Sequence, residues 1–105
     1  MNTKKFGLKN LEKKHGPMTV GSFLRSWRES EELSQKDFAA QIGMSSANLC
    51  DIEKGRKGVS PERAAEIAEA IGYSARVLIE IAFQEQLKDA GLSFEVTVKP
   101  SKEAV

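Results

Sequence analysis

The stretch that decides the fold is SQKDFAAQIGMSSANLCDIEKG, residues 34–55, which contains two short helical patterns separated by a brief interruption. Ser34 and Ser45 stand where the free amides at the start of a helix need a side-chain acceptor. Gly43 and Gly55 stand where the chain must turn away from a finished helix. The stretch therefore predicts two short helices joined by a tight turn at Gly43.

The second of these helices has two distinct faces. When positions are rotated by 100° per residue from Ser45, Leu49 and Ile52 fall on one side, which we expect to pack inward. The opposite, outward face is expected to hold small or polar residues: Ser46, Ala47, Cys50, Asp51 and Lys54. This outer face is therefore the candidate contact surface.

The same signals predict three more helices, one before this pair and two after it. Apolar spacing from Val20 to Trp27 indicates a first helix that runs to about Glu31. Two further helices are bounded by Ser–Gly pairs, one at Ser60 and Gly72 and one at Ser74 and Gly91. The expected architecture is an all-α, five-helix domain over residues 18–91.

Residues 92–99, LSFEVTVK, change the period of the pattern from 3.6 to 2. This alternation predicts a C-terminal β-strand. A lone strand on a helical domain has no ladder partner in its own chain, so we expect it to pair with another molecule in a dimer. The alternative, in which the segment folds over its own helices, stays open.

The last helix supports a dimer because VLIEIAF, residues 77–83, is apolar around more than one face. One face completes the core, and the other is expected to meet a second subunit. The expected dimerisation residues are Ile79, Phe83, Leu92, Phe94, Val96 and Val98.

Composition narrows the function classes. A chain of 105 residues allows one modest core, and a net charge of +1 permits nucleic-acid binding without demanding it. We expect residues 1–17 to form a basic flexible arm and residues 100–105 a disordered tail. With one cysteine, Cys50, and one histidine, His15, the sequence offers no metal cluster and no catalytic set, so no enzyme activity and no cofactor are expected. No apolar stretch approaches the roughly 20 residues of a membrane span, which favours a cytoplasmic location.

The chain resembles the phage-repressor helix-turn-helix family that includes Cro and Xre. The resemblance covers Thr19 to about Leu78 and rests on a set of matching residues: Ser34, Gln35, Ala39, Gly43, Met44, Ser45, Leu49, Ile52, Glu53, Gly55, Arg56 and Lys57. In that family the second helix of the pair enters the major groove of DNA and the first crosses the backbone. The resemblance implies a DNA-binding protein that acts as a dimer.

The resemblance also assigns roles to individual positions. Base contacts would come from Ser46, Ala47, Asn48 and Asp51, and phosphate contacts from Gln35, Ser45, Lys54, Arg56 and Lys57. Asn48 could pair with adenine and Asp51 could accept from cytosine, but no arginine is present to read guanine. The resemblance further implies a structural ion pair between Arg28 and Glu53.

These expectations combine into a transcriptional regulator, a dimeric repressor that binds double-stranded DNA at a palindromic operator. The compact size also resembles the HigA-like antitoxins, which bind a small toxin protein and repress their own operon. The alternative is a protein-interaction module that neutralises a partner protein and binds DNA only weakly.

Overall fold

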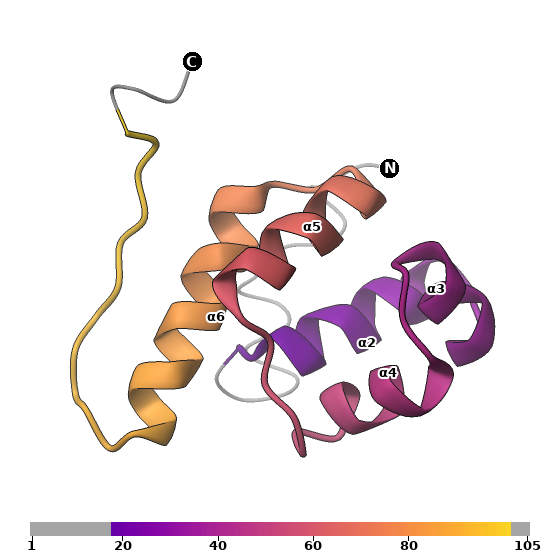
Figure 1. Ribbon diagram of the computed structural model, residues 1–105, viewed down its shortest axis with the longest axis horizontal. Coiled ribbons are helices and arrows are strands. Elements are labelled where there is room, and N and C mark those ends of the chain that lie inside the picture. The colour runs from indigo at the N-terminus through magenta and orange to yellow at the C-terminus, as the bar shows by residue number, and fades with distance from the viewer. Residues whose placement is uncertain (1–17, 102–105) are drawn as a thin grey trace.

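The computed structural model describes residues 18–101, and within them all regular secondary structure is helical (Figure 1). The five helices are α2 (Val20–Ser30), α3 (Gln35–Gln41), α4 (Ser46–Glu53), α5 (Pro61–Ile71) and α6 (Ala75–Asp89). The all-α class and the five predicted helices are therefore confirmed. The expected arm over residues 1–17 and the end of the expected tail, residues 102–105, lie outside the described residues.

The helices begin and end where the sequence predicts. At the start of each helix, a side-chain oxygen accepts a hydrogen bond from a backbone amide of the first turn. These oxygens belong, in chain order, to Thr19, Ser34, Ser45, Ser60 and Ser74. The glycines expected to end the later helices all have φ between 72° and 79°, a left-handed conformation that glycine adopts without steric cost: Gly43, Gly55, Gly72 and Gly91. The four predicted Ser–Gly pairs are thus confirmed.

Helix α2 lies at the centre of the molecule, between the α3–α4 pair and the α5–α6 pair (Figure 1). Its side chains contribute to one continuous apolar core, whose largest fully buried members are Phe23, Leu24, Phe38, Leu49, Ile67 and Leu78. Tyr73 packs its ring against Phe23 and Trp27, with centroid separations of 4.9 Å and 5.4 Å. The core therefore fixes α3 and α4 against the rest of the domain.

A glycine sets the approach of α2 to α4. A Cβ atom added at Gly21 would overlap the carbonyl oxygen of Ile52, so the two helix backbones meet at a distance that only glycine allows. No helix within residues 18–101 combines the length and the apolar character needed to cross a bilayer.

The predicted C-terminal β-strand is wrong for the described chain. Residues 92–99 are extended but form no strand, and they run back alongside α6 (Figure 1). The Gln84 side chain donates from Nε2 to the Phe94 carbonyl at 2.7 Å and accepts the Val96 amide at 2.8 Å. The Glu80 carboxylate accepts the Val98 amide at 3.0 Å.

Side chains of α6 therefore replace the backbone of a neighbouring strand along one edge of residues 94–98. An extended chain laid against a helix alternates its side chains between inside and outside just as a strand does. The period of 2 was a correct sign of extended backbone, but it could not identify the hydrogen-bond partner. In the structure of the single chain, the intramolecular alternative is the one adopted.

Candidate nucleic-acid interface

The turn between α3 and α4 is held by hydrogen bonds from both sides. The amide of Met44 donates to the Ala39 carbonyl at 2.9 Å, which closes the end of α3 around the left-handed Gly43. From α5, Nη2 of Arg63 donates to the carbonyl oxygens of Ile42 and Gly43 at 3.0 Å and 3.1 Å. Two carbonyls at the helix end thus gain a charged donor, and the start of α4 is fixed in direction.

Helix α4 divides into the two faces that the sequence predicts. Leu49 and Ile52 are buried in the core. Ser46 and Ala47 are exposed, and the remaining outward residues, Asn48, Cys50 and Asp51, are half-buried. The helix lies at the edge of the molecule, remote from α5 and α6 (Figure 1), so its outer face is open to a partner.

An ion pair joins α2 to the end of α4. Arg28 donates from Nε and Nη2 to the two carboxylate oxygens of Glu53, at 2.8 Å and 3.0 Å. The remaining Nη1 donates to the carbonyl of Leu33 at 3.0 Å, just before α3. The two charged side chains are only 15% and 3% exposed. Arg28 and Glu53 thus form the pair that the resemblance implies, in the bidentate geometry that gives such pairs their directionality.

The same network includes the first residue of α3. Nε2 of Gln35 donates to Oε1 of Glu53 at 3.1 Å, so one carboxylate receives hydrogen bonds from both α2 and α3. The hydrogen bonds to Glu53 raise the pKa of Arg28 above its ordinary value, against the opposing effect of burial, and the guanidinium stays charged. The network therefore fixes the ends of α2, α3 and α4 relative to one another.

Gln35 has a different role from the one expected of a pure phosphate ligand. Its side chain is half-buried and points to Glu53, which leaves one amide hydrogen and the backbone at the start of α3 for an anion. This contact could not be predicted from local sequence patterns, because Gln35 and Glu53 are brought together only by the folding of α3 against α4.

The basic loop after α4 folds back over the outer face of the helix. Nζ of Lys57 donates to Oδ1 of Asn48 at 3.0 Å, and Nη1 of Arg56 lies 3.5 Å from Oδ1 of Asp51. The loop is itself held by the carbonyl of Asp51, which accepts the amides of both Arg56 and Lys57. Asn48 and Asp51, which are expected to contact bases, are therefore paired in the free protein with Lys57 and Arg56, which are expected to contact phosphates.

These pairs are weak enough to rearrange on binding. The Arg56 side chain is 65% exposed and that of Asp51 is 35% exposed, and exposed ion pairs contribute about 0–1 kcal/mol. The other two expected phosphate contacts are also accessible: Ser45 is exposed, with its Oγ accepting the Asn48 amide, and Lys54 is exposed at the end of α4.

Two contributors to this site could not be found from the sequence. Gly21 permits the close approach of α2 to α4. Arg63, which lies far along the chain in α5, donates a hydrogen bond to a carbonyl at the turn between α3 and α4. Neither has a local pattern that points to α4. Within residues 18–101 no cluster of His, Cys, Asp and Glu side chains is arranged as a metal site.

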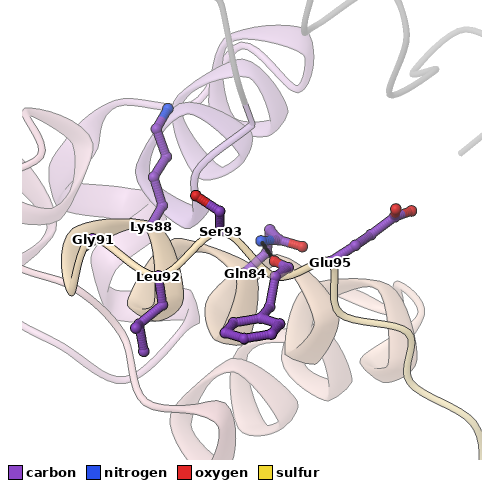
Figure 2. A pocket seen from close by; sticks show the side chains of 7 residues that line it. Gln84, Lys88, Gly91, Leu92, Ser93 and Glu95 are labelled. Carbon is purple, nitrogen blue, oxygen red and sulfur yellow. Dashed lines mark hydrogen bonds between the residues drawn. The ribbon is translucent and has the colours of Figure 1, made fainter.

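The residues expected at a dimer interface lie on α6 and the extended segment after it. Ile79, Val96 and Val98 are half-buried, whereas Phe83, Leu92 and Phe94 are 42%, 48% and 66% exposed. Figure 2 shows a depression between the end of α6 and this segment, with Leu92 and Gln84 on its lining. A second apolar surface is therefore present, well separated in sequence from α4.

Comparison with known proteins identifies the domain family of this chain. Residues 19–80 match a family model described as a helix-turn-helix domain. Two curated relatives, each called an uncharacterized HTH-type transcriptional regulator, come from Mycobacterium tuberculosis strains CDC 1551 / Oshkosh and ATCC 25618 / H37Rv. Each is 34% identical over 76 residues, which cover 67% of this chain and 54% of the relative. The chain thus spans about half the length of the curated relatives it matches, and no solved structure matches it significantly.

Proposed function

Because the chain belongs to the helix-turn-helix domain family, we propose that it is a DNA-binding transcriptional regulator, a dimeric repressor that acts on a palindromic operator. The observation that carries the proposal is the outer face of α4, which is open, rigidly supported and followed by a basic loop. Helix α4 would enter the major groove with Ser46, Ala47, Asn48 and Asp51 toward the bases.

Phosphate contacts would supply most of the affinity in this arrangement. Lys54, Arg56 and Lys57 follow α4, and Ser45 and Gln35 stand at the starts of α4 and α3. The base-facing residues are small or acidic and include no arginine, so they offer few strong direct contacts. Sequence choice would then depend on Asn48, on Asp51 and on the shape of the DNA.

A mobility-shift titration with DNA from upstream of the gene tests the proposal, against a shuffled duplex of the same composition. Ala47→Glu places a negative charge on the outer face of α4 and should abolish the shift. Gln86→Glu makes the same change of charge on an exposed position of α6 and should leave the shift intact. Equal binding of both variants would contradict the proposed role of α4.

The repressor part of the proposal has its own test. Transcription from the upstream promoter, measured with a reporter gene, should fall when the protein is supplied and should not fall with Ala47→Glu. An increase in transcription with the wild-type protein would make the regulator an activator.

The second candidate function is a protein-interaction module that neutralises a partner, such as a small toxin protein in an antitoxin pair. The exposed Phe83, Leu92 and Phe94 favour it, because large apolar side chains gathered on a surface mark interaction sites. An antitoxin that also represses its operon would satisfy both candidates. A protein without any sequence-preferred DNA complex would satisfy only the second.

A further inference from the structure

The extended segment after α6 has one paired edge and one open edge. The groups that bond to α6 are the Phe94 carbonyl and the Val96 and Val98 amides, all from even-numbered residues. In extended backbone, successive residues direct their N–H and C=O groups to opposite sides. The odd-numbered Glu95 and Thr97 therefore direct theirs away from α6.

This open edge resembles the edge of a β-sheet. Among the described residues, the amides and carbonyls of Glu95, Thr97 and Lys99 make no hydrogen bond, and all three residues are exposed. Figure 2 shows the Glu95 side chain extending away from Gln84. An unpaired row of backbone donors and acceptors is a template for another extended chain. The Gln84 amide, which both donates and accepts, keeps the segment extended from the other side.

We propose that this edge pairs antiparallel with the same edge of a second copy of the chain, in the register that places Thr97 opposite Thr97. The proposal deepens the dimer of the proposed function and depends on it. In this register Glu95 of each copy lies opposite Lys99 of the other. A two-fold axis repeats that opposite-charge pair, and each cross-strand pair of this kind is favourable.

Other registers lack this complementarity. Centring the pairing on Glu95 places like carboxylates opposite each other, and centring it on Lys99 does the same for like ammonium groups. Registers centred on Val96 or Val98 leave each charge opposite an uncharged residue, either Thr97, Ser93 or Ser101. Charge therefore selects the register centred on Thr97.

The neighbouring residues fit the same register. Pro100 has no amide hydrogen, but its nitrogen belongs to the even-numbered side that faces α6, so the open edge loses no donor. Phe94 comes opposite Pro100 of the second copy, and Val96 comes opposite Val98. The Phe94 side chain, 66% exposed in the single chain, would thereby gain an apolar neighbour.

Charge reversal tests the register in sedimentation equilibrium of the full chain without DNA. Glu95→Lys and Lys99→Glu each convert both cross-strand pairs to like charges and should raise the dimer dissociation constant on the order of tenfold or more. The double variant with both changes should return it to the wild-type value. Glu69→Lys, on an exposed position of α5, controls for net charge and should have no effect.

Cross-linking tests the register independently, in a Cys50→Ser background. Opposed residues have Cα atoms about 5.5 Å apart, within the range of a disulfide, so Thr97→Cys should join two copies under mild oxidation. Ser93→Cys should not, because its two copies would be separated by roughly 26 Å along the strands.

A chain that is monomeric at every concentration would overturn the proposal. So would a dimer that is indifferent to the charge reversals, or one that cross-links equally at both cysteines. Because these measurements contain no DNA, failure of the DNA-binding proposal would leave their outcome unchanged. Failure of the interface would in turn leave α4 testable on a single operator half-site.

Discussion

Replacing Arg28 by alanine should lower the free energy of unfolding by about 3 kcal/mol, because it strands a carboxylate that is almost fully enclosed. Arg28 bonds both carboxylate oxygens of Glu53, at 2.8 Å and 3.0 Å, and the Glu53 side chain is 3% exposed. In the variant, Glu53 keeps the hydrogen bond from Gln35, and the Leu33 carbonyl loses the donor it had.

A matched control lies one turn earlier on the same helix. Arg25 pairs with Glu29 at 3.3 Å, but these side chains are 57% and 52% exposed, so Arg25→Ala should cost less than about 1 kcal/mol. Urea unfolding followed by the fluorescence of Trp27 gives both free energies by linear extrapolation. Trp27 is buried in the core beside Tyr73, so its emission should change on unfolding.

A double replacement separates the cost of a stranded charge from the net value of the pair. Arg28→Met with Glu53→Leu removes both charges and should recover most of the lost stability, since buried pairs contribute little relative to apolar residues of similar volume. If Arg28→Ala were no more destabilising than Arg25→Ala, the proposed coupling of α2 to the end of α4 would be wrong.

Three further changes test other contacts. Gly21→Ala should cost about 2 kcal/mol because its methyl group overlaps the Ile52 carbonyl, whereas Gly58→Ala, where a methyl group meets nothing, should cost little; equal costs in urea unfolding would contradict this. Gly43→Ala should cost roughly 1 kcal/mol because φ is 74° there, and an unchanged urea midpoint would refute it. Glu85 concerns pH. Burial raises the pKa of Glu85, so its contribution to stability is complete below the unfolded-state pKa and is lost as the pH rises through the folded-state value. As the pH rises from below the unfolded-state pKa through the folded-state value, Glu85→Gln should therefore gain stability relative to wild type, and a difference that stays constant with pH would exclude the effect.

The helices were predictable because their signals are local. Ser45 and Gly55 mark the ends of α4 through bonds made within a few residues, and the structure has the cap and the left-handed glycine at those positions. The inward face of α4 followed from its periodicity, and Leu49 is indeed fully buried. Such features depend little on the rest of the chain.

Contacts between distant elements were not predictable in the same way. The period-2 pattern after α6 indicated extended backbone, but only the fold reveals that Gln84 supplies its hydrogen bonds. Likewise, nothing near Arg63 in the sequence points to the turn at Gly43, which it caps. The resemblance to phage repressors pointed to Arg28 and Glu53 because it carries information about three-dimensional neighbours that periodicity lacks.

The salt dependence of DNA binding tests the central claim, that α4 and its basic loop bind DNA chiefly through phosphates. Titration of a labelled upstream duplex at several salt concentrations should give a steep linear fall of log K with log salt, by about 0.9 per phosphate contacted. Arg56→Ala should make the slope shallower by about one unit without changing the preferred sequence, whereas Asn48→Ala should change the preference and keep the slope. No sequence-preferred complex at any salt concentration, or a slope that Arg56→Ala leaves unchanged, would contradict the claim.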